Sequence, residues 1–356
     1  MSVRRSAPRS RRALGLAALV GLASGACNLL LIASGPKFSL RREPIADGVA
    51  AADHRERDRL RLLVFGDSGT GKDDQRKVAG HMAQECAARG GCDLALMLGD
   101  NIYGHGVARS RERDGRVVFD VKFAERFERV YQDLGRLDFW AIAGNHDWYS
   151  AESVDAQIAY TRHSERWRFL AHDYAVPLLP SWIRIYGLDT TKLERGRDGG
   201  QVERARGALC GGGGWKILIG HHPLYSSGWH GNARGEYPKM IDPLLEPLLE
   251  ACGVHFYLSG HDHHQEHLSA PGFEQIVQGA AGKLRDVNRI ARRSPGVEQL
   301  GAASLFGFAL LEATAERLEV RFFGYGPGRR YSAWHCRAYE RASFGEPERR
   351  SVPCRP

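Results

Sequence analysis

Short apolar runs alternate with longer polar stretches along most of this chain. The runs read as short buried strands and lie at 61–65, 94–98, 139–143, 183–188, 216–219 and 255–258. Stretches with helical periodicity separate several of them, at 73–89, 120–134, 154–170 and 237–251. Because strands alternate with helices, we predict an α/β core. Two late strand-like segments without an intervening helix, 273–281 and 305–323, predict a second, more antiparallel sheet.

The pattern weakens towards both ends, which predicts four segments. Residues 35–58 are charged and poor in apolar side chains, as expected of a linker between an N-terminal segment, 1–34, and a folded domain, 59–328. The last segment, 329–356, is predicted to be a basic C-terminal tail. With 356 residues and 43% apolar content, the chain is long enough to bury a sizeable core.

The positive net charge belongs to the ends of the chain. The formal charge is +8, but residues 1–34 hold five arginines and no acidic residue, and residues 329–356 hold seven arginines and three glutamates. The folded part is therefore close to neutral, and no basic stripe interleaved with aromatic residues crosses it. Nucleic acid is not expected as a specific partner.

The first segment resembles a targeting sequence, because its five arginines precede the uncharged, leucine- and alanine-rich stretch 13–34. Three interpretations stay open: a twin-arginine export signal around Arg11 and Arg12, one transmembrane helix with the arginines in the cytoplasm, or a lipoprotein anchor at Cys27. Ser24 stands where a lipoprotein signal prefers leucine. We expect the protein to be exported (periplasmic or extracellular), or anchored in a membrane and facing outward.

The six other cysteines are an even number in a chain expected to reach an oxidising compartment, which favours disulfides. Cys86 with Cys92 and Cys336 with Cys354 are the local pairs, and Cys210 and Cys252 are left over. Buried free thiols are the alternative. No two cysteines have the spacing of a zinc ribbon, so a structural zinc site of that kind is not expected.

Five short polar blocks, each just after an apolar run, carry the candidate chemistry: Gly66-Asp67-Ser68-Gly69, Gly99-Asp100-Asn101-Ile102-Tyr103, Gly144-Asn145-His146-Asp147, Gly220-His221-His222-Pro223 and Gly260-His261-Asp262-His263. Polar residues at the carboxyl ends of strands in an open α/β sheet converge on one crevice. Carboxylates hold hard cations, and imidazole suits zinc, iron and manganese. The blocks therefore predict a hydrolytic site with two metal ions.

Asp100 is the predicted bridge between the two metals, because a carboxylate can bind two cations through its two oxygens. Six further donors form two groups. Asp67, Tyr103 and His263 are predicted to bind one metal, and Asn145, His221 and His261 the other. A phenol with a pKa of about 10 binds as phenolate only to a strongly Lewis-acidic ion, so Tyr103 indicates ferric iron. Such a centre would activate water to attack a phosphate ester.

The blocks resemble those of the purple acid phosphatases, within the calcineurin-like metallophosphoesterases, and among them the small tartrate-resistant type. Further runs carry the resemblance, which covers about 60–325: Asp155-Ala156-Gln157-Ile158-Ala159-Tyr160, Arg166-Trp167-Arg168-Phe169, Leu188-Asp189-Thr190 and the run that begins at His221 and ends His230-Gly231. The resemblance implies a two-sheet β-sandwich flanked by helices, with the metals at one edge. It also implies hydrolysis of phosphate monoesters with a metal-bound hydroxide as the nucleophile.

Carried over by position, the resemblance implies Fe(III) on the group that contains Tyr103 and a divalent iron, zinc or manganese ion on the other. His146 and His230 match two non-ligand histidines that contact phosphate and assist the leaving group. A histidine can donate a proton under mildly acidic conditions, which suits that role. Only the family register and the following proline favour His221 over His222.

The chain departs from the family pattern in a few places. Ser68 and Thr70 replace a tryptophan and a glycine that often lie beside the first aspartate, and Trp229 stands where small animal enzymes have an acidic residue. Neither change removes a donor. Diesterase relatives generally lack the phenol of Tyr103 and carry a histidine where this chain has Gly69, which favours monoesters over the alternative of a phosphodiesterase or nucleotidase.

Two other hypotheses come from different classes. The segment 66–72 fits a phosphate-binding P-loop frame, but Asp73 stands where serine or threonine must bind magnesium. A non-catalytic binder of metal or phosphate in the cell envelope is disfavoured because every donor position is filled. We expect a small phosphate ester as substrate. The natural substrate and the oligomeric state do not follow from the sequence.

Overall fold

The computed structural model describes residues 51–113, 116–197, 199–230, 244–287, 296–344 and 354, all within the compact unit Phe38–Pro356. The predicted targeting segment and most of the predicted linker lie outside the described residues. In the part of the chain that is described, no helix is long and apolar enough to cross a membrane.

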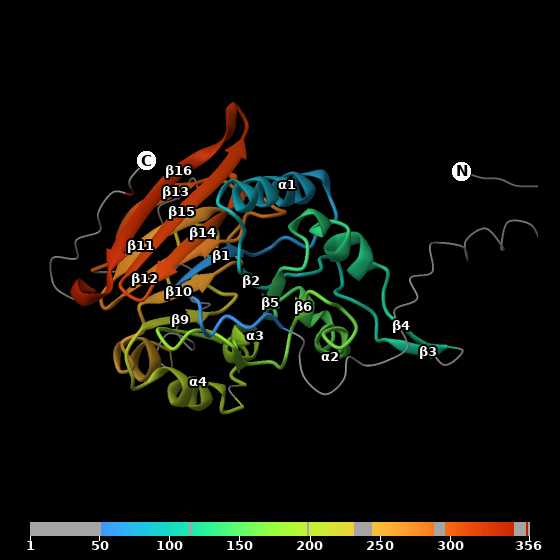
Figure 1. Cartoon of the computed structure of the whole chain (residues 1–356). Helices are drawn as coiled ribbons and strands as arrows, with labels where there is room; N and C mark the ends of the chain where they lie inside the picture. Colours follow the sequence, from blue (N-terminus) through green and yellow to red (C-terminus); the bar gives the residue numbers. More distant parts are fainter. Residues whose placement is uncertain are drawn as a thin grey trace, which may run out of the picture. The chain divides into compact units, whose positions relative to one another are not determined.

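The first sheet has the predicted parallel strands at one side and the late strands at the other (Figure 1). β1 pairs in parallel with β2, β2 with β5 and β5 with β6, while β14 pairs antiparallel with β1 on its other edge. In spatial order the strands are β16 (Arg329–Glu340), β15 (Arg317–Gly326), β14 (Phe306–Thr314), β1 (Arg59–Phe65), β2 (Leu94–Met97), β5 (Asp138–Ala141) and β6 (Trp167–Arg168).

The second sheet also mixes parallel and antiparallel pairs. Its parallel centre runs from β8 through β9 and β10 to β12, and β11 pairs antiparallel with β12. In spatial order the strands are β13 (Glu298–Ala303), β11 (Gln265–Ala270), β12 (Phe273–Gln278), β10 (Phe256–Ser259), β9 (Trp215–Ile219), β8 (Ile183–Gly187) and β7 (Tyr174–Ala175). A small separate ladder joins β3 (Arg111–Arg113) to β4 (Arg116–Val118).

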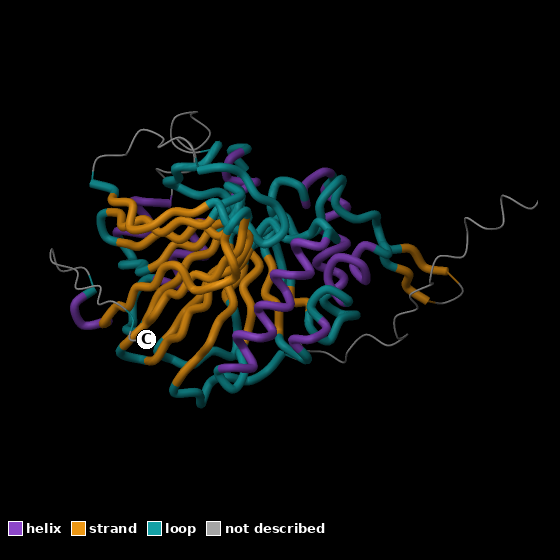
Figure 2. The backbone as a smooth tube through the Cα atoms, turned by 90° about the horizontal axis from the view of Figure 1, so that it is seen from above, coloured by secondary structure: helices purple, strands orange, loops and turns teal. Residues whose placement is uncertain are grey.

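The two sheets pack against each other through alternate side chains of their strands. In β9, Trp215 and Ile217 belong to the main core, whereas Leu218 belongs to a second cluster on the outer face. The indole of Trp215 crosses to the other sheet and donates to the carbonyl of Thr314 at 2.8 Å. Helices cover the outer faces (Figures 1 and 2): α1 (Asp73–Ala88) on one side, α3 (Thr190–Glu194) and α4 (Gln201–Leu209) on the other. The predicted sandwich flanked by helices is confirmed.

Two predicted helices are shorter than the periodicity indicated. Residues 120–134 form a π-helical turn, η1 (Ala124–Glu128), and a 3₁₀ turn, η2 (Gln132–Leu134), rather than one α-helix. The stretch 154–170 contains only α2 (Ala151–Tyr160), after which the Thr161 hydroxyl bonds to both backbone groups of Phe169 and turns the chain into β6. Of 237–251, the described part contains η5 (Leu245–Glu250).

The sequence predicted that the late strands form a second, more antiparallel sheet, but they are divided between the two mixed sheets. β14 to β16 extend the first sheet and β11 to β13 extend the second, because β14 pairs with the free edge of β1 and β12 with that of β10. Part of the predicted tail, 329–340, is therefore β16. The end of the predicted linker packs too, with Ala52 donating to Asp138 at 2.7 Å. The four-segment division itself stays a prediction.

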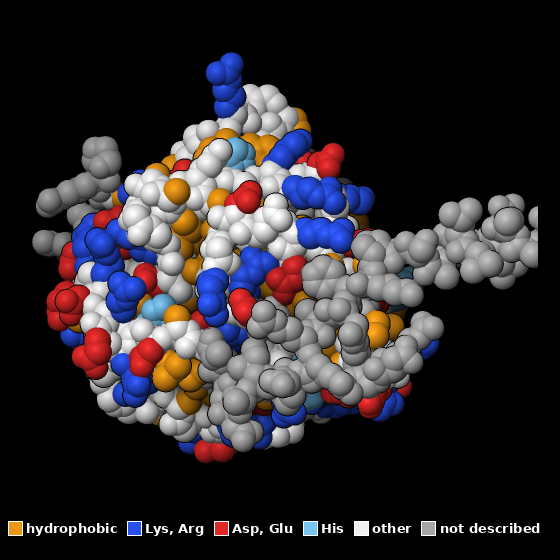
Figure 3. Space-filling model, turned by 45° about the vertical axis from the view of Figure 1, so that its right-hand side comes forward, with side chains coloured by type: hydrophobic (Ala, Val, Ile, Leu, Met, Phe, Trp, Pro, Cys, Tyr) orange, Lys and Arg blue, Asp and Glu red, His pale blue; other side chains and the backbone are white. Residues whose placement is uncertain are grey.

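Three disulfides join Cys86 to Cys92, Cys210 to Cys252 and Cys336 to Cys354. The favoured reading of the cysteines, two local pairs and one distant pair, is confirmed. Basic and acidic side chains are interspersed on the face drawn in Figure 3, which agrees with a folded part that is close to neutral.

Candidate metal centre

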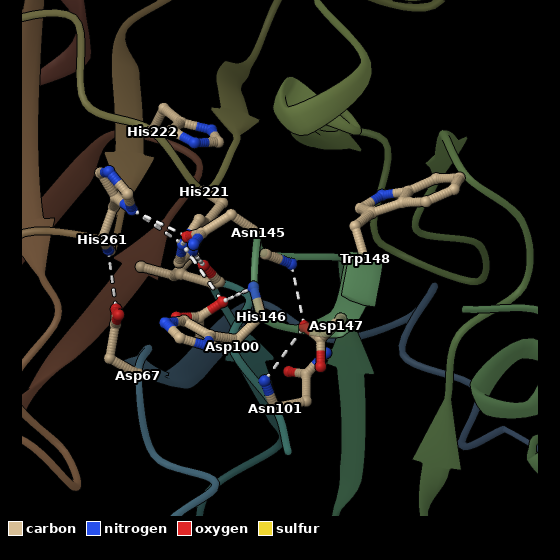
Figure 4. A network of polar contacts seen from close by, with 12 residues as sticks. Asp67, Asp100, Asn101, Asn145, His146, Asp147, Trp148, His221, His222 and His261 are labelled. Carbon is tan, nitrogen blue, oxygen red and sulfur yellow. Dashed lines mark hydrogen bonds and ion pairs between the residues drawn. The ribbon is translucent and has the colours of Figure 1, made fainter. Parts of the chain in front are cut away.

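The five polar blocks meet at one edge of the sandwich, beyond the carboxyl ends of β1, β2, β5, β9 and β10. Backbone hydrogen bonds join neighbouring blocks: Asp67 donates to Gly99 at 3.0 Å, and Gly260 donates to His221 at 3.0 Å. Figure 4 shows the side chains that follow these strands pointing towards one another. Parallel strand order thus brings together donors that lie as much as 196 residues apart in numbering, from Asp67 to His263.

The backbone is strained where the donors begin. Asp67, Asp100 and His261 have φ values of 56°, 51° and 67°, in the left-handed region that non-glycine residues rarely adopt. Hydrogen bonds from distant residues hold these loops: the amide of His261 donates to Asp67 Oδ2 at 2.7 Å, and that of His146 to Asp100 Oδ1 at 2.8 Å. Such strain persists only where surrounding contacts impose it, and it concentrates at functional sites.

The glycines before the donors allow close approach of the backbone. A Cβ on Gly144 would collide with the amide and carboxylate of Asp100, and a Cβ on Gly260 would collide with the carboxylate of Asp67. No side chain can be accommodated at these positions without moving a donor. The repeated glycine-donor pattern of the sequence therefore has a packing cause.

The first predicted group forms a compact triangle of donor atoms. The Tyr103 hydroxyl lies 2.8 Å from Asp67 Oδ1 and 3.2 Å from His263 Nε2, and His263 Nε2 lies 3.3 Å from the same Asp67 oxygen. All three residues are buried. Burial, together with the charges of Asp67 and Asp100, raises the pKa of Tyr103 well above its ordinary value. Without a cation the phenol therefore stays protonated and donates to Asp67.

The second predicted group forms a triangle of similar size. Asn145 Oδ1 lies 3.0 Å from both His221 Nε2 and His261 Nδ1, and the two imidazole nitrogens are 3.2 Å apart. Ligands at adjacent positions of a metal with bonds of about 2.1 Å lie about 3 Å apart. Both triangles therefore have the dimensions of one face of a metal's coordination sphere.

Asp100 lies between the two triangles. Its Oδ1 is 3.4 Å from His221 Nε2 and accepts the amide hydrogen of His146 at 2.8 Å, and its charge acts on Tyr103 in the other triangle. Asp67, Asp100 and His221 have ligand atoms within 4.8 Å of one another and are fully buried. A buried carboxylate shared by two donor sets is the position that a bridging ligand requires.

The two imidazoles of the second triangle differ in protonation. His221 Nδ1 lies 2.8 Å from the carbonyl of Leu98, which can only accept, so Nδ1 carries a hydrogen and Nε2 is the nitrogen left to face a metal. Against the effect of burial, the charges of Asp100 and Asp67 raise the pKa of His221, so a cation would have to displace a proton there. Burial, helped by the neighbouring histidines, lowers the pKa of His261 well below its usual range. A neutral imidazole is the form that binds a metal.

The structure also separates the adjacent histidines that the sequence left ambiguous. His222 Nδ1 lies 2.9 Å from the hydroxyl of Thr190, and His264 Nε2 lies 3.0 Å from Glu266. His221 and His263 supply the nitrogens of the triangles instead. The Thr190 hydroxyl also accepts the amide hydrogens of His221 at 3.0 Å and of His222 at 3.1 Å, which holds this turn in place.

The two predicted phosphate-contacting histidines lie beside different donor sets. The ring of His146 lies 4.8 Å from that of Tyr103, and its buried Nδ1 has no hydrogen-bond partner among the described residues. Burial lowers the pKa of His146. The ring of His230 lies 4.1 Å from that of His261, and its amide donates to Asp262 at 2.9 Å. Each histidine thus lies next to one donor triangle.

Asp147 organises the site, although it was not among the residues predicted to act there. Its buried carboxylate accepts amide hydrogens from Gly144 at 2.9 Å, Asn101 at 3.1 Å and Ile102 at 3.2 Å, and the side-chain amide of Gln157 at 2.9 Å. Figure 4 shows it between the Asp100 and Asn145 loops. In the sequence, Asp147 is visible only as an acidic residue at the end of a donor block. Its role depends on the backbone amides that it contacts, and a sequence motif does not show these.

Comparison with known proteins gives the relatives of this chain. The profile of the calcineurin-like phosphoesterase family matches residues 60–265. Human tartrate-resistant acid phosphatase type 5 is 30% identical over 318 residues, covering 78% of this chain and 89% of the human protein.

Two solved structures share the fold. Purple acid phosphatase PPD1 from yellow lupin seeds has a TM-score of 0.61 at 16% identity, covering 79% of this chain and 53% of the lupin chain. GAP50, described as the anchor in the inner membrane complex of Plasmodium, has a TM-score of 0.61 at 19% identity, covering 78% of this chain and 89% of that protein. At these identities the likeness concerns the fold alone, and the sequence matches decide the family. The chain belongs to the calcineurin-like phosphoesterases, in the group of the purple, tartrate-resistant acid phosphatases.

Proposed function

We propose that this chain hydrolyses phosphate monoesters at a centre of two metal ions held by the two donor triangles, with Asp100 between them. The observation that carries the proposal is the size and arrangement of the triangles, whose edges of 2.8–3.3 Å match adjacent ligands of one metal. The family relationship implies a dinuclear centre. When bound, the metals would supply Lewis-acid activation of the phosphate and of the attacking water.

The protein's own residues would orient the phosphate and manage protons. His146 would contact a phosphoryl oxygen beside Asp100, where its unpaired buried Nδ1 lacks a partner among the described residues. His230 would donate a proton to the leaving group from the other side, beside His261. An imidazole with a pKa near neutrality is suited to that step.

Ferric iron with a divalent iron, zinc or manganese ion fits the donor sets. Tyr103 and Asp67 are hard oxygen donors, which favour a trivalent hard ion, and the second triangle offers two imidazoles and a neutral amide, which favour a divalent one. The buried, protonated phenol would lose its proton on binding the ferric ion.

A diesterase or nucleotidase is the second candidate, and a local contact disfavours it. A Cβ on Gly69 would collide with the backbone of Asn101 and Ile102. The histidine that diesterase relatives carry at this position therefore cannot be accommodated here. The fold alone does not decide between a catalyst and a non-catalytic binder, because one fold hosts both, but none of the seven predicted donors is replaced.

Hydrolysis of p-nitrophenyl phosphate and bis-p-nitrophenyl phosphate by the purified full chain, measured against pH, tests the proposal. We expect the monoester to be the better substrate and its turnover to peak below neutrality. A preference for the diester at neutral or alkaline pH would assign the chain to the phosphodiesterases. No metal-dependent turnover of either ester would favour a non-catalytic binder.

Comparing intact expressing cells with lysates tests the proposed export, because exported enzyme acts without lysis.

Replacing Tyr103 by phenylalanine tests the ferric site by spectroscopy. The wild-type protein is expected to be coloured by charge transfer from the phenolate to iron, and Tyr103→Phe should remove that visible band while the ring still packs against His146. Iron content is measured on the same samples. An unchanged band in the variant would remove Tyr103 from the metal centre.

A further inference from the structure

One loop, residues 281–287, crosses the edge of the candidate metal centre and is held at several points. Ala281 donates to the carbonyl of Gly66 at 3.3 Å, Arg285 to that of His263 at 2.8 Å, and Val287 to the hydroxyl of Ser304 at 2.8 Å. A Cβ on Gly282 would collide with the backbone of Ser68. The loop is thus pressed against the residues that follow β1, and its side chains have defined positions at the site.

Lys283 places a positive charge on the first donor triangle. Its Nζ lies 3.5 Å from the centre of the Tyr103 ring, on the face of the ring. Burial lowers the pKa of Lys283, and the negative charges of Asp100 and Asp67 partly oppose that shift. The side chain is only partly exposed.

Arg285 places a second positive charge at the other donor triangle. Its Nη1 lies 3.3 Å from Nε2 of His230, whose ring lies 4.1 Å from that of His261. Unlike Lys283, Arg285 is exposed, so its guanidinium faces solvent at the side of the site where His230 lies. One loop therefore supplies a cation to each side of the centre, two residues apart in sequence.

We propose that Lys283 and Arg285 are substrate-binding residues: Lys283 contacts the phosphoryl group, and Arg285 contacts a second anionic group on the alcohol portion of the substrate. The inference rests on the proposed phosphatase function and adds a substrate class, phosphate monoesters that also carry a carboxylate or a further phosphate. A guanidinium binds either group through paired hydrogen bonds. The charges are local, since the folded part as a whole is close to neutral.

The position of each cation assigns its role. Lys283 is partly buried against the ring of Tyr103 in the first donor triangle, where the substrate would present its phosphoryl oxygens. Arg285 lies beside His230, the proposed donor to the leaving group, so it faces the part of the substrate that departs as the alcohol. An anionic group there is within reach of the guanidinium, whereas an uncharged alcohol gains nothing from it.

A matched pair of esters tests Arg285. The full chain is assayed with 4-carboxyphenyl phosphate and 4-carbamoylphenyl phosphate, which have similar size and differ by one charge. We expect wild type to favour the carboxylate ester in kcat/KM. We expect Arg285→Gln to lower that preference by about fivefold, the size of an exposed charge pair, and Arg285→Lys to keep part of it. Arg136→Gln, which alters an exposed arginine near Glu165, should keep the wild-type preference.

Inorganic phosphate as a competitive inhibitor tests Lys283. Lys283→Gln should raise the inhibition constant by about tenfold or more, because a charge-assisted hydrogen bond is lost, with metal content equal to wild type. Loss of metal in this variant would make Lys283 a structural residue of the centre and overturn its assignment.

An unchanged preference for the carboxylate ester in Arg285→Gln would overturn the substrate class. If wild type turns over neither ester, the proposed function fails instead.

Discussion

Replacing Asp100 by asparagine should lower kcat for p-nitrophenyl phosphate by at least about a thousandfold. An amide carries no charge and cannot bind two cations through two equivalent oxygens, so the centre loses its shared ligand. The fold should be retained, because asparagine tolerates the left-handed backbone that Asp100 adopts at φ 51°. The amide oxygen can still accept the amide hydrogen of His146, which donates to Asp100 at 2.8 Å.

The variant is compared with Asp155→Asn, which makes the same chemical change on the exposed face of α2. With metal removed from all samples by a chelator, both variants should melt within about 3 °C of wild type. In the untreated samples, only Asp100→Asn should lose activity and bound metal. Activity near the wild-type value in Asp100→Asn would refute the two-metal assignment. A large drop in the melting temperature of the metal-free variant relative to metal-free wild type would show that the carboxylate is needed for folding.

Replacing Asp147 by alanine should lower the free energy of unfolding by at least about 3 kcal/mol. The carboxylate is fully buried and accepts hydrogen bonds from Gly144, Asn101, Ile102 and Gln157. Each buried N–H left without an acceptor costs about 1–3 kcal/mol. Because these bonds join the Asp100 loop to the Asn145 loop, the variant should also lose metal affinity.

Urea unfolding followed by tryptophan fluorescence measures the effect, with Asp155→Ala as the matched exposed control. Asp147→Asn should be less destabilised than Asp147→Ala, since it keeps one acceptor oxygen. A loss below about 1 kcal/mol in Asp147→Ala would mean that the two loops hold their positions without this residue.

The structure agrees with those predictions that depend on residues close together in the sequence. The strands that end before Asp67, Asp100 and His221 were predicted because a run of apolar side chains followed by glycine and a polar residue can be recognised within a few positions. Their convergence also followed, because parallel strands place their carboxyl ends at one edge. The disulfide between Cys86 and Cys92 was likewise favoured by the short distance along the chain.

Other features depend on partners distant in sequence. The helix predicted at 154–170 stops after Tyr160 because the chain pairs with β5 through Trp167, and residues of the predicted tail form β16 because β15 offers an edge. Tertiary pairing overrides local periodicity in both cases.

The sequence by itself determined which residues can bind metal and that the strand ends bring them together, because residue type and strand periodicity are local properties. Only the tertiary structure decided which member of each histidine pair lies in a donor triangle and why Gly69 excludes a side chain. It alone showed that Asp147 joins two loops and that the 281–287 loop brings Lys283 and Arg285 to the centre. These features are distances between residues that lie far apart along the chain, and a distance of that kind exists only once the sheets have packed.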